Sequence, residues 1–240
     1  MNNEVKIAYF SMEIGISNNL PTYSGGLGVL AGDTLKSSAD LKIPMVAVTL
    51  LSKKGYFRQD IDSDGRQVEY PIDWDPSKFM ICLSKKVAVQ IEGRNVYIQA
   101  WRYNVRSVTG GEVDVLYLDT DVEENTKEDR ENTAFIYGGY EQYRLKQEIV
   151  LGIGGVRILH ALGFHIKKYH MNEGHASLLT LELLLMYKRD IESVWDERWI
   201  WDVDTVRDLC VFTTHTPIDA GHDRLSYDIV KKMLGEVIPM

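Results

Sequence analysis

The chain contains the stretch Leu20-Pro21-Thr22-Tyr23-Ser24-Gly25-Gly26-Leu27-Gly28-Val29-Leu30-Ala31-Gly32-Asp33, in which four glycines follow an apolar run and lead into helical spacing. A glycine lets the backbone approach a ligand without a Cβ in the way. The free N–H groups at the start of the next helix point toward negative charge. We therefore predict an anion cradle at this loop, with a phosphate or a sugar hydroxyl as its ligand.

The segments on either side of this loop predict a parallel sheet. Residues 5–12 are typical of a buried strand, residues 27–41 of a helix with small residues suited to close packing, and residues 43–51 of a second buried strand. Strand, helix and strand in this order imply a parallel pair. We expect an α/β fold built on a Rossmann-like parallel sheet.

Residues 57–118 change this pattern to antiparallel strands. Two segments, 86–91 and 96–103, flank a glycine-containing turn at residues 92–95. Residues 113–118 add a further strand. We expect a β-hairpin insertion in the parallel sheet.

The segments after the insertion return to the α/β pattern. Residues 119–132 are so rich in acidic side chains that we expect an exposed loop. Residues 133–162 have apolar residues at helical spacing, and we attribute the glycines within 152–155 to tight packing against the sheet. Two more parallel strands are predicted at residues 166–171 and 209–213.

Polar motifs follow three of the predicted parallel strands. They are Gly25–Gly28, Asn172–His175 and Thr214–Thr216. A right-handed doubly wound sheet gathers the carboxyl ends of its strands at one edge, which is where such sheets bind ligands. Each motif alone fits a turn or a structural histidine, but their joint placement favours a functional site.

The composition narrows the range of partners and compartments. A net charge of −8 in 240 residues leaves no basic surplus for nucleic acid or an anionic membrane surface. The two cysteines are too few for a disulfide framework, which favours a reducing compartment. The sequence contains no signal pattern and no apolar run of membrane-spanning length, so we expect a cytoplasmic protein.

A dinucleotide site and a metal site fit this sequence less well. Residues 26–31 satisfy the G-x-G-x-x-A fingerprint, but the second strand is followed by Ser52-Lys53-Lys54, where an acidic residue for a ribose is expected. Four histidines between residues 160 and 175 recur every five residues, a step that prevents them from sharing one helix face. We expect no bound nicotinamide, flavin or metal.

The glycine stretch and three later runs occur in the same order as in the α-glucan (glycogen, starch, maltodextrin) phosphorylases, which the sequence resembles. The later runs are GYFRQ at 55–59, HMNEGHA at 170–176, and FTTHTP at 212–217 with AGHDR at 220–224. Asn-Glu-Gly-His stands where mammalian and plant members have Asn-Asp-Thr-His, so the shorter bacterial or archaeal type is the closer likeness. The resemblance implies that residues 1–240 form the amino-terminal domain of a GT-B fold, without the carboxyl-terminal cofactor domain.

The resemblance also implies a reaction and a cofactor. Phosphorylases of this family convert an α-1,4-glucan, or a maltooligosaccharide, and phosphate into glucose 1-phosphate with retained configuration. Their pyridoxal phosphate acts through its phosphate group, by proton exchange with the substrate phosphate. By this likeness the loop whose backbone amides meet the phosphates consists of Gly25, Gly26, Leu27 and Gly28. Gly25 and Gly26 are expected to contact the cofactor through its phosphate group only.

Four residues of the two later motifs are expected on the sugar side of the site. His215 matches the histidine that binds a glucose hydroxyl and stabilises the developing positive charge through its carbonyl group. Asn172, Glu173 and His175 match a motif that lines the sugar pocket. The cofactor lysine and the phosphate-binding lysine and arginines belong to the carboxyl-terminal domain, so we expect the 240-residue chain alone to be inactive.

Two alternatives to a phosphorylase remain open from the sequence. An ADP-glucose-dependent glucan synthase of the same fold also uses a Gly-Gly-Leu-Gly loop, although such enzymes usually have a lysine where this chain has Tyr23-Ser24. A non-catalytic glucan-binding module is the other alternative. The sequence leaves open whether the protein is a homo-oligomer, since apolar surface normally covered by the missing domain promotes self-association.

Overall fold

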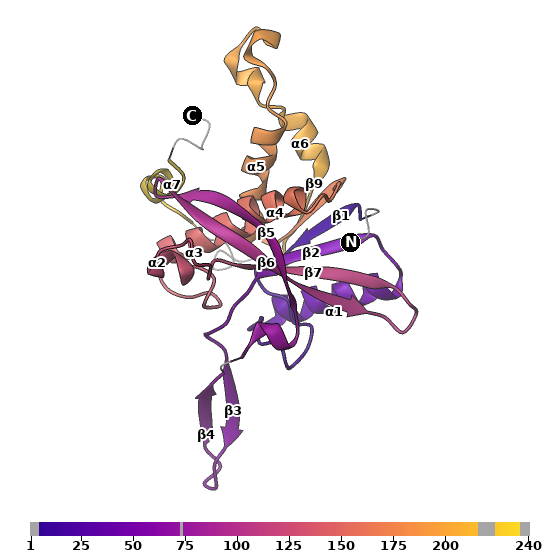
Figure 1. Cartoon of the computed structure of the whole chain (residues 1–240), viewed down its shortest axis with the longest axis vertical. Coiled ribbons are helices and arrows are strands. Elements are labelled where there is room, and N and C mark those ends of the chain that lie inside the picture. The colour runs from indigo at the N-terminus through magenta and orange to yellow at the C-terminus, as the bar shows by residue number, and fades with distance from the viewer. Residues whose placement is uncertain (1–4, 73, 216–223, 236–240) are drawn as a thin grey trace.

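A sheet with a parallel centre runs through the structure. The computed structural model describes residues 5–72, 74–215 and 224–235. The strands of the main sheet are β1 (Ile7–Phe10), β2 (Met45–Leu50), β5 (Ile81–Ile91), β6 (Arg94–Arg106), β7 (Glu112–Asp119), β8 (Lys168–Asn172) and β9 (Cys210–Thr213). Within the described residues they lie in the order β5-β6-β7-β2-β1-β8-β9 (Figure 1). Neighbours from β7 to β9 are parallel, whereas β5 and β6 are antiparallel and extend one edge. The predicted α/β fold with a parallel sheet is confirmed.

Helices cover both faces of the parallel strands. They are α1 (Gly26–Asp40), α2 (Lys127–Arg130), α3 (Glu141–Ile149), α4 (Gly155–Ala161), α5 (Leu179–Met186), α6 (Val203–Leu209) and α7 (Tyr227–Leu234). On one face Tyr9 and Ala47 pack with Leu35 of α1. On the other, Phe10 and Val48 pack in one apolar cluster with residues of α3, α4 and α5. Strands buried on both faces are continuously apolar, which is why β2 is buried at every position.

The order strand, helix, strand that the glycine stretch predicted is present. β1 leads to α1, α1 leads to β2, and β1 and β2 pair in parallel. Pro44 immediately precedes β2, and the predicted strands near residues 170 and 211 are β8 and β9. Among the described residues, no helix is both long and apolar enough to cross a bilayer.

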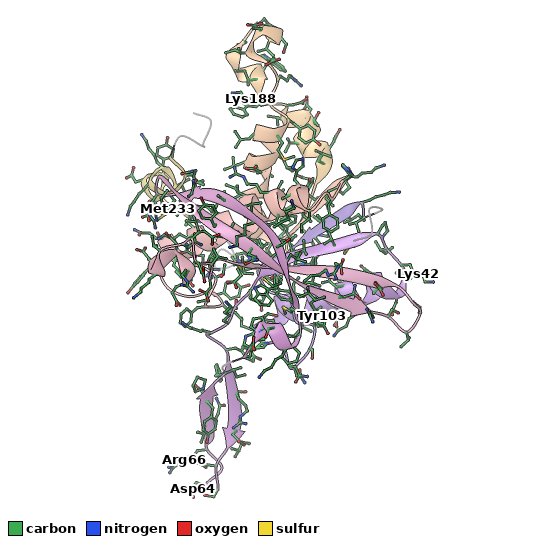
Figure 2. All side chains as sticks on the ribbon, in the orientation of Figure 1. Lys42, Asp64, Arg66, Tyr103, Lys188 and Met233 are labelled. Carbon is green, nitrogen blue, oxygen red and sulfur yellow. The ribbon has the colours of Figure 1, made fainter. Side chains whose placement is uncertain are left out.

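The antiparallel insertion has two separate parts. β5 and β6 are joined by a tight turn in which Glu92 and Gly93 both have positive φ, 51° and 74°, as a two-residue type I′ turn requires. β3 (Phe57–Ile61) and β4 (Gln67–Pro71) instead form a two-stranded hairpin of their own. This hairpin points away from the body, with Asp64 and Arg66 at its tip (Figure 2).

Gly154 and Gly155 lie where the helices approach the sheet closely, as expected, whereas Gly152 packs against Leu178 and Leu179 at the start of α5 instead of against the sheet. A Cβ at Gly154 would lie 2.4 Å from the Ile98 side chain, and one at Gly155 would lie 2.6 Å from the Phe10 ring. The segment Val150–Gly154, η2, is a π-helical turn between α3 and α4. The predicted helical region begins only at Glu141, because residues 133–140 form turns and loop.

The prediction that residues 119–132 form an exposed loop is wrong in part. Asp119, Asn125, Asp129 and Asn132 are all buried. Asp129 is 1% exposed and accepts two hydrogen bonds from the Arg94 guanidinium, at 2.9 and 2.8 Å. A buried carboxylate is stable when it is paired in this way. The acidic composition therefore reflects specific partners as well as solvation.

Glu92 fastens the last described helix to the body. Its carboxylate forms ion pairs with Arg94, Lys146 and Lys232, and its N–H donates to the carbonyl oxygen of Met233 in α7. Burial opposes ionisation of Glu92, but the hydrogen bonds from the three cations outweigh it and lower its pKa to about 2. The attachment of α7 therefore depends on a charged Glu92.

Candidate active site

The two polar loops that follow β8 and β9 meet directly. The His215 N–H donates to Oε1 of Glu173 at 2.5 Å, and the Thr214 hydroxyl donates to Oε2 at 3.2 Å. Glu173 is 3% exposed and has a φ of 67°, in the left-handed region, where a non-glycine residue is uncommon. The backbone turn at Glu173 thus aims a buried carboxylate at the loop after the neighbouring strand.

Asn172 holds the imidazole ring of His215. Its Oδ1 lies 2.8 Å from Nε2 of His215, and its Nδ2 donates to Oγ of Ser11 at 3.2 Å. Ser11 Oγ donates onward to the carbonyl oxygen of Glu13 at 2.8 Å. Because an amide oxygen only accepts, this chain of bonds assigns a proton to Nε2 of His215. Asn172 is 1% exposed, so it acts on the ring from beneath instead of facing an open pocket.

The glycine loop presents open space at its first two glycines. Gly25 is the N-cap of α1, and a Cβ at Gly25 or Gly26 would meet no atom within 4 Å. The N–H groups of Ser24 and Gly25 already donate to Oε2 of Glu13, at 2.5 and 3.1 Å. Within the described residues, no acceptor is found for the N–H groups of the first turn of α1, at residues 26–28. These amides remain for a ligand.

His175 is connected to Glu13 through Tyr137. Its ring centroid is 5.6 Å from that of Tyr137, and Nη2 of Arg144 lies 3.3 Å from its Nε2. The Tyr137 hydroxyl donates to Oε1 of Glu13 at 3.1 Å. Glu13 therefore links the glycine loop to the His175 side of the site.

Sequence reasoning missed Glu13, Tyr137 and Arg144. An acidic residue directly after a buried strand was a signal for Glu13. Nothing in the local sequence marked the other two, because they lie in an irregular segment and on a helix between the motifs.

His170 supports the site from within β8. Its Nε2 lies 2.8 Å from Oγ1 of Thr213, and its ring contacts Tyr9 edge-on at 5.0 Å between centroids. Burial, with a smaller contribution from His215, lowers the pKa of His170 below its usual value. The ring is therefore neutral at pH 7.

The motif at 55–59 lies at the base of the β3–β4 hairpin, and only its first aromatic residue approaches the loop. The rings of Tyr56 and Tyr23 are 5.8 Å apart, whereas Phe57 is 41% exposed and Arg58 stacks on Tyr70 at 5.1 Å. Residues 216–223 of the later motifs lie outside the described residues.

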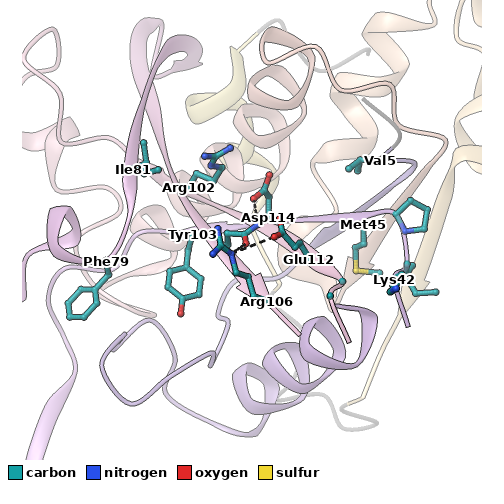
Figure 3. A pocket seen from close by; sticks show the side chains of 15 residues that line it. Val5, Lys42, Met45, Phe79, Ile81, Arg102, Tyr103, Arg106, Glu112 and Asp114 are labelled. Carbon is teal, nitrogen blue, oxygen red and sulfur yellow. Dashed lines mark hydrogen bonds and ion pairs between the residues drawn. The ribbon is translucent and has the colours of Figure 1, made fainter. Parts of the chain in front are cut away.

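A cavity of about 870 Å³ lies at the opposite end of the sheet (Figure 3). It is lined by Pro44 and Met45 at the amino end of β2 and by Arg106 and Glu112, which flank the turn between β6 and β7. None of the candidate residues lines it. In the described part of the chain, no group of three or more His, Cys, Asp or Glu side chains is placed to hold a metal ion.

Comparisons with known proteins agree on one family. The family model described as carbohydrate phosphorylase matches residues 18–137. Maltodextrin phosphorylase of Thermococcus litoralis is 40% identical, over 98% of this chain and 28% of that protein. Glycogen phosphorylase of Mycobacterium tuberculosis is 41% identical over 96% of this chain and 27% of its own length. Glycogen phosphorylase of Aquifex aeolicus is 34% identical, over 94% and 32%. The chain thus spans roughly a quarter to a third of these relatives.

Proposed function

This chain belongs to the carbohydrate phosphorylase family, and from that premise we propose that it is the glucan-side, amino-terminal part of an α-1,4-glucan phosphorylase. The reaction is transfer of the terminal glucosyl unit from a glucan or maltooligosaccharide to phosphate, which gives glucose 1-phosphate with retained configuration. The whole enzyme is then a glycosyltransferase of GT-B fold, and the parallel sheet supplies its first Rossmann-like domain. The relatives' names support the reaction, since they are maltodextrin and glycogen phosphorylases.

One observation carries this proposal: the glycine loop and the β8 and β9 motifs converge at the carboxyl edge of the parallel strands. The first-turn amides of Gly26, Leu27 and Gly28 suit an oxyanion. His215 is linked to Glu13 through Asn172 and Ser11. A phosphate and a sugar are thereby offered adjacent contacts from a rigid frame.

His215 is the residue of this chain that we assign to the reacting sugar. Asn172 holds its imidazole ring and Glu173 accepts a hydrogen bond from its backbone N–H. We assign to its carbonyl dipole the stabilisation of positive charge that develops on the glucosyl ring. From the family resemblance we also assign Asn172, Glu173 and His175 to the sugar side of this site.

The glycine loop fits the phosphate of pyridoxal phosphate. A Cβ at Gly25 or Gly26 would meet open space, and the first-turn amides of α1 face it with the positive end of the helix dipole. When bound, the cofactor supplies a phosphate that exchanges a proton with the substrate phosphate. Gly25 and Gly26 and the first-turn amides of α1 would hold and orient its phosphate group, and we assign the covalent lysine to the carboxyl-terminal domain of the whole protein.

The proposal assigns the rest of the site to residues beyond this chain. The named relatives are three to four times as long as this chain. We propose, from the family resemblance, that the phosphate-binding lysine and arginines belong to the carboxyl-terminal part of the whole protein. We propose that the 240-residue chain alone is inactive and that the whole protein works in the cytoplasm. Whether the whole protein forms a homo-oligomer is measured in the same experiment.

The test is glucose 1-phosphate formation by the protein encoded in the complete reading frame. Maltoheptaose, orthophosphate and pyridoxal phosphate are supplied, and His215→Ala is the matched variant. We expect phosphate-dependent product from the wild type and about 100-fold less from the variant, which loses a contact to the reacting sugar. Glucosyl transfer from ADP-glucose without phosphate, or glucan binding without any turnover, would replace the proposal with a synthase or a binding module. Sedimentation of the same sample gives its oligomeric state.

A further inference from the structure

Glu13 is a buried carboxylate held almost entirely by backbone and hydroxyl donors. It is 3% exposed, and Oε2 accepts the N–H groups of Ser24 and Gly25 while Oε1 accepts the Tyr137 hydroxyl. Among the described residues, no Lys, Arg or His forms an ion pair with it. Its charge is therefore stabilised by the amides at the amino end of α1.

The chain segment that carries Glu13 is locked against α1. The Gly15 N–H donates to the carbonyl oxygen of Gly28 at 2.8 Å. A Cβ at Gly28 would lie 2.8 Å from Oε2 of Glu13, and a Cβ at Gly32 would lie 1.9 Å from the carbonyl oxygen of Gly15. Both glycines are required so that this segment, and with it the Glu13 carboxylate, reaches the loop.

We infer that Glu13 is a positioning residue for the glycine loop. It occupies the amides of Ser24 and Gly25, and in doing so it holds the next three amides, at residues 26–28, toward the ligand. This inference rests on the proposed function, because it says which amides of the loop, those of residues 26–28, bind the anion of the proposed reaction. The anion of the reaction then binds beside an internal carboxylate, at the three amides that the carboxylate leaves open.

The same carboxylate makes the loop rigid before any ligand arrives. Charge-assisted hydrogen bonds are about twice as strong as neutral ones. A group held in its reactive geometry contributes to the rate, and a displacement of about 1 Å costs about 100-fold. Through Tyr137, Glu13 also couples the position of the loop to that of His175.

The test compares Glu13→Gln with Glu182→Gln in the protein from the complete reading frame. Glu13→Gln keeps the size of the side chain and removes its charge. Glu182 is the matched control, because it is also a buried carboxylate. Its Oε2 lies 2.7 Å from Nη2 of Arg157, and neither residue belongs to the candidate site. Amide hydrogen exchange of the peptide covering residues 20–35 reports the loop without requiring activity, and steady-state kinetics report the reaction.

In Glu13→Gln we expect the loop amides to exchange at least about tenfold faster and kcat to fall about 10- to 100-fold, while KM for the glucan changes less than about threefold. Glu182→Gln leaves both loop exchange and kcat at wild-type values. Should Glu13→Gln not fold, Tyr137→Phe removes the hydroxyl that donates to Oε1 of Glu13 and is expected to raise loop exchange about threefold.

The inference is overturned if loop exchange in Glu13→Gln equals the wild-type rate, or if Glu182→Gln loosens the loop equally. It is also overturned if the loop loosens while kcat stays unchanged. A wild-type protein that makes no glucose 1-phosphate contradicts the proposed function instead. The exchange measurement still decides in that case whether Glu13 holds the loop.

Discussion

Three glycines of α1 provide a graded test of how closely this helix packs. A Cβ at Gly26 would meet nothing within 4 Å, one at Gly28 would lie 2.5 Å from Cβ of Tyr23, and one at Gly32 would lie 1.9 Å from the carbonyl oxygen of Gly15. All three positions lie within one helix of 15 residues, so their alanine substitutions change the same helix propensity in different surroundings.

The expected free energies follow from two opposing contributions. Alanine in place of glycine stabilises a helix interior by about 1 kcal/mol, and less at the first position. Overpacking costs about 1–3 kcal/mol, and the upper value applies at Gly32 because the atom it meets is backbone that cannot rotate away. We expect Gly32→Ala to lose about 2 kcal/mol, Gly28→Ala about 1 kcal/mol, and Gly26→Ala to be neutral or slightly stabilising.

Urea unfolding followed by circular dichroism measures all three variants. For a chain of this length about 2 kcal/mol corresponds to a decrease in Tm of about 4–8 °C. Equal slopes of unfolding free energy against urea confirm that the comparison is one of native-state packing. If Gly32→Ala is as stable as the wild type, or if Gly26→Ala loses as much unfolding free energy as Gly32→Ala, then residues 13–15 do not pack against α1 as closely as described.

Three other outcomes are expected. The partners of Glu92 lower its pKa to about 2 from an ordinary 4.5, so its contribution to stability is complete above pH 4.5 and is lost as the pH falls toward 2. Glu92→Gln should flatten this part of the plot of urea midpoint against pH, and an unchanged plot would contradict a stabilising role of the charged Glu92. The pKa of His170 lies below 6.5 because the ring is buried, so protonation of this ring destabilises the fold as the pH drops below that value. Titration of its C2–H signal by NMR should give a midpoint under 6.5, and a higher midpoint would show that burial does not lower the pKa of His170. Asn172→Ala frees the ring of His215, and kcat of the complete protein should fall about 10- to 100-fold with little change in Tm; full activity would show that the Asn172 bond does not position the ring.

The order of the elements could be predicted from the sequence because it depends on local patterns. Continuous apolar runs marked β1 and β2, and helical spacing after the glycines marked α1. A right-handed parallel arrangement then brings the ends of the strands to one edge without any knowledge of side-chain contacts. For the same reason, the meeting of the Asn172–His175 motif with His215 followed from strand positions alone.

Local patterns did not predict which charges are buried. Residues 119–132 have the composition of a solvated loop, yet Asp129 is buried against Arg94, which is 35 residues away in the chain. The prediction of an exposed loop from acidic composition assumes that every carboxylate is more stable in water than inside the protein. A guanidinium that arrives from another strand reverses this preference.

The sequence by itself determined the parallel framework and the edge at which the motifs gather, because both depend on residues near one another in the chain. Only the tertiary structure decided what holds those motifs. Tyr137 reaches Glu13 across 124 residues, and Asn172 reaches Ser11 across 161. A hydrogen bond between such distant residues leaves no periodic trace in the sequence, since it exists only after the sheet and its helices have brought the two side chains within 3 Å or so of each other.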